Sequence, residues 1–71
     1  MAARTNHQCE QAAKCLPSTS EWKIFRMAFN IAYKAGLTCD EAIALATAET
    51  RLINPGFIPT GIDRRRLEDQ R

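Results

Sequence analysis

Four side chains of the kinds that bind zinc occur in the sequence, but their spacing argues against a metal site. They are one histidine and three cysteines: His7, Cys9, Cys15 and Cys39. Structural zinc sites commonly contain two cysteines separated by two residues, and this chain has no such pair. On a helix, Cys9 would lie on the apolar side, where a thiol acts as a small hydrophobic group. We therefore expect no metal and no cofactor, and we expect the odd number of thiols to be reduced.

The residues needed for catalysis are also missing. His7 is the only histidine, and no serine lies at a helical spacing that would make it a nucleophile beside this ring. The glycines form no phosphate-binding loop, because Asn54-Pro55-Gly56 and Thr60-Gly61 are typical of turns. We predict that the protein is not an enzyme.

A row of polar side chains runs along an otherwise apolar segment, residues 20–36. Four positions interrupt the apolar and aromatic residues of this segment: Lys23, Arg26, Asn30 and Lys34. At about 100° per residue they fall within an arc of roughly 80° on a helix. A helix that is apolar over most of its circumference belongs in a core. Its basic row is then either a solvated face or a binding surface for phosphates or an acidic protein.

The second basic group is a run of three arginines near the end of the sequence: Arg64, Arg65 and Arg66. Glu68 and Asp69 lie four residues after Arg64 and Arg65, so intrahelical ion pairs would neutralise part of the charge. The charge also changes sign along the chain, since residues 21–37 carry +2 and residues 38–53 carry −2. This pattern permits a nucleic-acid partner but does not require one.

The central segment also carries more aromatic surface than the rest of the chain can easily cover. Its aromatic residues are Trp22, Phe25, Phe29 and Tyr33. We expect Trp22 and Tyr33 to form an exposed aromatic rim beside Arg26. Exposed apolar surface next to basic residues is typical of protein-binding sites, where Trp, Tyr and Arg contribute most. The predicted partner-binding residues are therefore Trp22, Lys23, Arg26, Asn30, Tyr33, Lys34, Arg64, Arg65 and Arg66.

Capping signals indicate the helices that position these residues. Ser18 and Glu21 have the spacing of a capping box, which predicts that the central helix begins just after Ser18. Gly36 suits the left-handed position that ends a helix, and Thr38 with Glu41 forms a second capping box directly afterwards. The predicted centre of the fold is an αα-hairpin with helices at about 19–35 and 39–53.

Shorter elements are expected to cover this hairpin. A first helix over residues 5–16 begins with a capping box formed by Thr5 and Gln8. Residues 54–62 cannot form a regular helix, and we expect them to cross the central helix. A last helix follows Asp63, and its end is expected to be frayed because three arginines in its first turn oppose the helix dipole.

These elements also predict which side chains are buried against the central helix. The expected buried face of the 39–53 helix consists of Ala42, Leu45, Ala46, Leu52 and Ile53. Glu49 projects near the middle of this face, and we expect it to lie at a rim or to pair with a basic residue. The segment 54–62 is expected to contribute Phe57, Ile58 and Ile62.

The composition is that of a single small domain of 71 residues. We predict an all-α fold, a small bundle of three to four helices, with an ordered core over about residues 16–62 and flexible termini. No apolar run is long enough to cross a membrane, and residues 1–8 lack the apolar part of a secretory signal. We therefore expect a cytoplasmic protein with no membrane association.

A helix-turn-helix is the nucleic-acid motif closest to this pattern, because Ala32, Gly36 and Leu37 resemble its turn. Two features argue against it. The helix before the turn is about twice as long as the motif uses, and Asp40 and Glu41 would face DNA phosphates.

The stretch Glu21-Trp-Lys-Ile-Phe-Arg-Met-Ala-Phe-Asn-Ile-Ala-Tyr-Lys-Ala-Gly36, in a short helical chain without catalytic residues, resembles small phage-encoded transcription regulators of the Xanthomonas phage type. The resemblance implies binding to host RNA polymerase in the host cytoplasm, inhibition of initiation at host promoters and an antitermination role. It assigns no individual binding residues.

The leading hypothesis is therefore a monomeric, non-enzymatic regulator that binds a larger host protein, RNA polymerase. One alternative is a small DNA-binding regulator that uses the basic row and the arginine run. Another is a homodimeric hairpin that buries its surplus apolar surface against a second copy.

Overall fold

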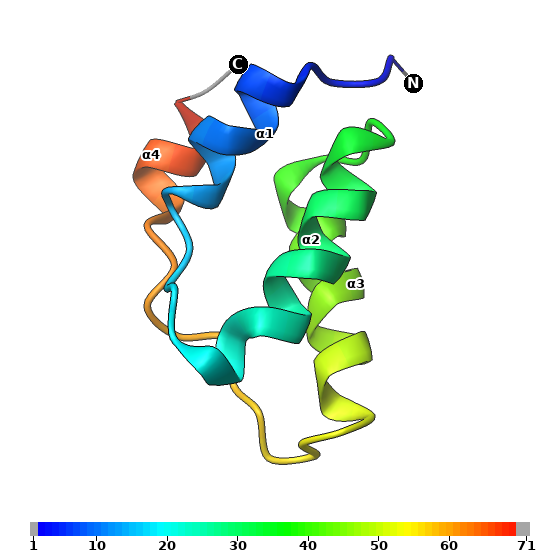
Figure 1. Ribbon diagram of the computed structural model, residues 1–71, viewed down its shortest axis with the longest axis vertical. Coiled ribbons are helices and arrows are strands. Elements are labelled where there is room, and N and C mark those ends of the chain that lie inside the picture. Colours follow the sequence, from blue (N-terminus) through cyan, green and yellow to red (C-terminus); the bar gives the residue numbers. More distant parts are fainter. Residues whose placement is uncertain (1, 70–71) are drawn as a thin grey trace.

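The computed structural model describes residues 2–69, and within this range every regular element is helical. The elements are α1 (Asn6–Ala13), a short 3₁₀ turn η1 (Ser20–Trp22), α2 (Lys23–Lys34), α3 (Cys39–Arg51) and α4 (Arg64–Glu68). Helices α2 and α3 form an antiparallel hairpin, and α1 and α4 both lie on one side of this hairpin (Figure 1). The predicted all-α bundle with a central αα-hairpin is confirmed.

The turn of the hairpin is built from the predicted local signals. Gly36 has φ 104°, in the left-handed region. The amide of Leu37 donates to the carbonyl of Ala32 at 3.2 Å, which satisfies a carbonyl at the end of α2. Thr38 and Glu41 then form the capping box that starts α3, with each side chain accepting a hydrogen bond from the other residue's backbone amide. These short-range hydrogen bonds stop one helix and start the next within three residues.

The start of α2 differs from the prediction. The capping box of Ser18 and Glu21 is not formed, and the chain makes the 3₁₀ turn η1 before α2 begins at Lys23. This tighter turn carries Trp22 into the core, where its ring lies 4.7 Å from that of Phe25 and 5.2 Å from that of Phe57. Burying an indole ring stabilises the fold by more than one exposed capping bond, so the tertiary contact decides the start of the helix.

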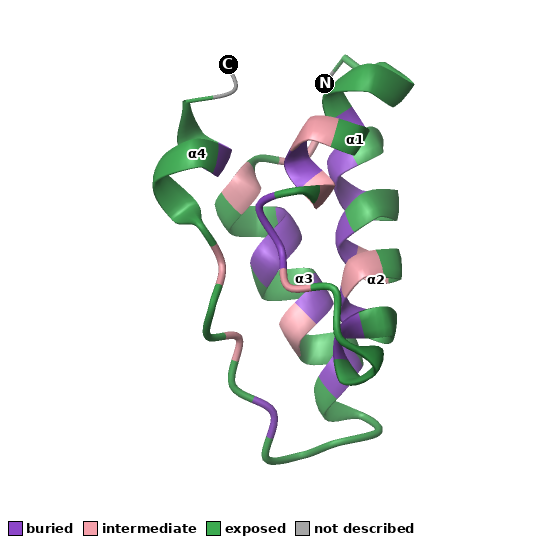
Figure 2. Cartoon of the chain, turned by 60° about the vertical axis from the view of Figure 1, so that its left-hand side comes forward, coloured by how far each residue is buried: buried purple, intermediate pink, exposed green. Residues whose placement is uncertain are grey.

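The centre of the core is a column of aromatic rings along one side of α2. Most buried positions of α2 lie on that same side of the helix (Figure 2). Phe25 and Phe29 are stacked, and Phe29 in turn stacks on Tyr33 with ring centres 5.2 Å apart. Phe57 covers this column from the segment 54–62, as predicted. Ile58 does not, because 67% of its surface is exposed.

The core extends beyond the predicted range of 16–62 at both ends. Cys9 and Ala12 of α1 are buried, and so is Leu67 of α4. The predicted helix 5–16 is shorter, since α1 ends at Ala13, but its capping box of Thr5 and Gln8 is present. Because Ala12 has no bulk, α1 can approach the hairpin closely. Both short helices are therefore part of the hydrophobic core.

The buried face of α3 is rotated relative to the prediction. Ala42 and Ala46 are buried as expected, but Ile43 and Thr50 replace Leu45, Leu52 and Ile53, which are exposed. Thr50 is tolerated inside because its hydroxyl donates to the carbonyl of Ala46 at 2.7 Å. Glu49 is exposed, which agrees with its predicted place at a rim.

Candidate protein-binding surface

The predicted basic row is only partly at the surface. Lys23, Asn30 and Lys34 are exposed along α2, and the ammonium of Lys34 donates to Oδ1 of Asn6 at 3.1 Å. Arg26 is half-buried and turned toward α1. Its Nε is buried and makes no hydrogen bond within residues 2–69, beside a cavity of about 500 Å³ that Glu10 also lines. The exposed row therefore has three members and not four.

The predicted aromatic rim is wrong. Trp22 and Tyr33 are 5% and 1% exposed, so neither ring is available to a partner. Tyr33 is covered by Arg4, whose guanidinium carbon lies 3.7 Å from the ring centre. Arg4 also donates to the carbonyls of Tyr33 and Leu37 at the end of α2. The sequence reasoning missed Arg4, because nothing in its local sequence links it to a helix about 30 residues later.

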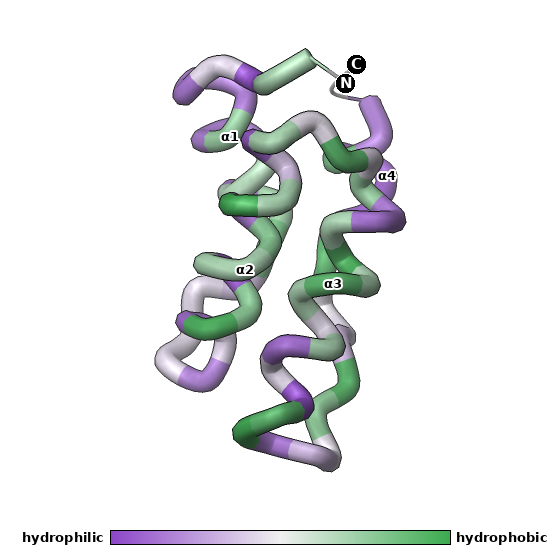
Figure 3. The backbone as a smooth tube through the Cα atoms, turned by 90° about the vertical axis from the view of Figure 1, so that its right-hand side faces the viewer, coloured by the Kyte–Doolittle hydropathy of each residue, from purple (hydrophilic) through white to green (hydrophobic). Residues whose placement is uncertain are grey.

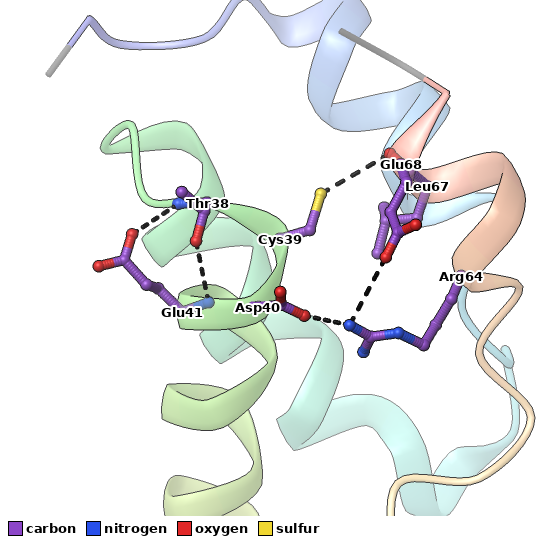
Figure 4. A network of polar contacts seen from close by, with 7 residues as sticks. All are labelled: Thr38, Cys39, Asp40, Glu41, Arg64, Leu67 and Glu68. Atoms are coloured by element: carbon purple, nitrogen blue, oxygen red, sulfur yellow. Dashed lines mark hydrogen bonds and ion pairs between the residues drawn. The ribbon is translucent and has the colours of Figure 1, made fainter.

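The arginine run lies on α4, and two of its members pair with acidic residues; Figure 4 shows the pairing of Arg64. Arg64 contacts Asp40 of α3 and lies 3.7 Å from Glu68, which confirms the predicted intrahelical pair. Arg66 lies 4.0 Å from Asp63. Arg65 is exposed and makes no ion pair with another described residue. Only Arg65 of the three is therefore left with an uncompensated charge.

The two basic groups do not form one surface. Helix α4, which carries the arginine run, lies on the opposite side of the molecule from α2 in Figures 1 and 2. The predicted binding residues therefore divide into three sets: the buried Trp22 and Tyr33, the exposed row on α2, and the arginines on α4.

The structure instead exposes an apolar surface that the sequence analysis missed. Five large side chains form it, and we call it the outer hairpin face: Ile24, Met27 and Ile31 of α2, with Leu45 and Leu52 of α3 and its C-terminal end. Ile31 and Leu52 are the most open, at 71% and 79% exposed. The signal for the α2 part was present in the spacing i, i+3, i+7, which separates these residues from the aromatic column of the same helix.

Helix geometry places the two halves of this face side by side. On α2, Ile24, Met27 and Ile31 fall within an arc of roughly 60°, next to Ala28. On α3, Leu45 and Leu52 lie next to the buried Ala42 in the same angular direction. Because the helices are antiparallel, the same direction around each axis leads to the same side of the hairpin. Figure 3 faces this side and shows hydrophobic segments along both helices.

The rim of the outer hairpin face is charged, with opposite signs on the two helices. Lys23 and Lys34 border it on α2 and Glu41 borders it on α3, while Glu49 lies on the α2-facing side of the two leucines. The Thr38 backbone amide and hydroxyl lower the pKa of the Glu41 carboxyl below its usual range. An apolar centre with a charged rim is the usual composition of a protein-binding surface.

A polar cavity of about 540 Å³ lies where the four helices meet, lined by residues that include Arg4, Tyr33, Cys39 and Leu67. The thiol of Cys39 donates to the carbonyl of Leu67 at 3.6 Å. Burial raises the pKa of the Tyr33 hydroxyl, and the nearby Cys39 adds to this effect. The Cys39–Leu67 hydrogen bond joins α3 to α4, and Arg4 contacts Tyr33 beside the same cavity.

Neither a metal-binding cluster nor a membrane-spanning helix occurs within residues 2–69. No group of three or more His, Cys, Asp or Glu residues in that range could hold a metal ion. In the same range no helix has the length and apolar character needed to cross a membrane.

Comparison with known proteins adds no relative from which residues could be transferred. The chain matches no protein-family model, no curated protein and no solved structure. The resemblance to phage transcription regulators therefore stays a prediction that depends on the residues of the central helix.

Proposed function

We propose that this protein is a non-enzymatic regulator that acts by binding a larger protein through the outer hairpin face. The observation that carries the proposal is the exposure of Ile24, Met27, Ile31, Leu45 and Leu52 on one side of a hairpin that is otherwise well packed. In a soluble domain, a contiguous apolar surface with a polar rim marks an interaction site. Lys23 and Lys34 favour a partner that is acidic beside its apolar contact.

Bacterial RNA polymerase is the proposed partner, because the central helix resembles that of phage regulators of transcription. In this proposal, binding inhibits initiation at host promoters and changes termination. The described residues support the protein-binding part of the proposal through their packing, while the identity of the partner depends on the resemblance.

Binding to purified RNA polymerase from a Xanthomonas host tests the proposal. We expect the chain to co-elute with the polymerase and to reduce transcription from a host promoter. Ile31→Asp should weaken binding by about tenfold or more, because it places a charge within the apolar contact. Lys23→Glu should weaken binding less, since it changes only the rim.

The matched control is Ile58→Asp. Ile58 has almost the same exposure as Ile31, but it follows Phe57, which packs on the opposite side of α2. Equal loss of binding in both variants would contradict the outer hairpin face as the site. If the polymerase binds neither the wild-type chain nor any variant, the proposed partner is wrong.

A DNA-binding role for the basic residues is tested with the same proteins. Binding to duplex DNA that weakens steeply as salt rises, and that is lost in Arg65→Ala but kept in Ile31→Asp, would favour that role instead.

A further inference from the structure

The outer hairpin face is complementary to itself in charge. Helix α2 contributes two basic residues, Lys23 and Lys34, and α3 contributes two acidic residues, Glu41 at the rim and Glu49 between its leucines and α2. The one basic residue of α3, Arg51, is directed elsewhere, because its Nε donates to the carbonyl of Phe57 at 3.0 Å. A surface with one basic half and one acidic half can pair with a copy of itself.

We propose that a second copy of this chain occupies the outer hairpin face when no other partner is bound, giving a symmetric four-helix dimer. The inference rests on the proposed protein-binding role of that face, but it does not depend on RNA polymerase being the partner. Two hairpins that meet through their apolar faces would bury the exposed isoleucines and leucines in one shared core.

Two symmetric arrangements are available to such a dimer. If the two-fold axis runs parallel to the helices, α2 of one copy packs against α3 of the other. If the axis lies across the helices, α2 packs against α2 and α3 against α3. In the first arrangement the basic residues of α2 face the acidic residues of α3 in the other copy. In the second arrangement like charges face each other, which destabilises an interface.

The first arrangement also aligns the apolar residues by height. Because the turn at Gly36 joins the two helices at one end, Ile31 lies near that end, Met27 and Leu45 lie near the middle of their helices, and Ile24 and Leu52 lie near the other end. A two-fold axis parallel to the helices preserves these heights. Met27 of one copy then faces Leu45 of the other, and Lys34 of one copy lies near Glu41 of the other.

Sedimentation equilibrium over a wide range of protein concentration tests the proposal on the full chain. We expect a reversible dimer for the wild type. Ile31→Glu should raise the dimer Kd by about tenfold or more, whereas Ile58→Glu should leave it unchanged. Circular dichroism of each variant checks that the exposed substitution has not altered the helical fold.

The double variant with Lys23→Glu and Lys34→Glu separates the two arrangements. It makes α2 acidic, so it should weaken a dimer in which α2 meets the acidic α3, and high salt should restore part of the loss. A dimer whose Kd the double variant leaves unchanged would overturn the proposed arrangement. In the second arrangement α2 packs against α2, so like charges face each other both before and after the substitutions. A chain that is monomeric at every concentration would overturn the dimer altogether.

Failure of this inference is distinguishable from failure of the proposed function. A monomer that binds polymerase through Ile31 removes only the dimer. A dimer that does not bind polymerase removes only the proposed partner. If both hold, added polymerase should dissociate the dimer, because the two complexes use the same face.

Discussion

Arg4 lies against the face of the Tyr33 ring, with its guanidinium carbon 3.7 Å from the ring centre. The same guanidinium donates to the carbonyl of Leu37 at 2.7 Å, and the backbone amide of Arg4 donates to the carbonyl of Lys34 at 3.0 Å. A cation at this position satisfies carbonyls at the C-terminal end of α2 and complements the helix dipole. The contact therefore connects the segment before α1 to the centre of the bundle.

Replacing this arginine should destabilise the protein. We expect Arg4→Ala to lower the free energy of unfolding by about 1–3 kcal/mol, because it removes the cation–π contact and two hydrogen bonds, one to the carbonyl of Tyr33 in α2 and one to that of Leu37 in the following turn. Arg4→Lys should recover only part of the loss, since an ammonium lacks the planar fork. Urea unfolding measures the change, and Arg65→Ala, which removes an exposed arginine, serves as the control with a change within about 0.5 kcal/mol.

The pKa of Tyr33 predicts how stability depends on alkaline pH. Burial raises the pKa of Tyr33 above its ordinary value, and Cys39 adds to the rise while Arg4 opposes it. The hydroxyl therefore contributes stability that is fully present below the unfolded pKa of about 10 and is lost as the pH rises through the folded pKa.

Ultraviolet absorbance of the phenolate measures this shift directly, because Tyr33 is the only tyrosine. The folded chain should titrate at higher pH than the same chain unfolded in urea. Identical midpoints in the two states would mean that burial does not affect the hydroxyl.

Two of the turn glycines, Gly36 and Gly56, should respond differently to an added methyl group. Gly36→Ala should destabilise the protein by about 1 kcal/mol, because φ 104° strains any residue with a Cβ. Gly56→Ala is the matched control. Its φ is not positive, and the nearest atom that the new Cβ would meet is 3.9 Å away, so we expect no loss of stability. Thermal unfolding of both variants checks the contrast.

Helix α4 should depend on its buried leucine more than on its ion pairs. Leu67→Ala should lower the free energy of unfolding by about 2–5 kcal/mol, because Leu67 is buried in the core. Asp40→Ala should cost less than about 1 kcal/mol, since the side chains of both Asp40 and Arg64 are about half exposed or more. Denaturant unfolding that ranked the two variants in the reverse order would show that charge holds α4 in place.

Several helix ends were predictable because they depend on residues three or four positions apart. The capping boxes of Thr5 with Gln8 and of Thr38 with Glu41 are both present, and Gly36 ends α2 as expected. The predicted box of Ser18 with Glu21 failed because the alternative conformation buries Trp22, a contact that involves Phe57 from a distant segment.

The binding surface was harder to predict, because α2 carries two apolar stripes. One contains Phe25, Phe29 and Tyr33, and the other contains Ile24, Met27 and Ile31. Hydrophobic periodicity identifies both stripes but does not say which one faces the core. The small face of α3, with Ala42 and Ala46, accepts the aromatic rings, so the isoleucines remain outside.

The helical class, the antiparallel hairpin and most of its ends follow from local sequence, because hydrogen bonds and backbone preferences act between neighbouring residues. The rotation of α2 and α3, the burial of Trp22 and Tyr33 and the turn of Arg26 toward α1 follow from contacts between distant segments. These outcomes depend on how the volumes of side chains from distant segments fit together in one core, and a linear pattern does not contain that information.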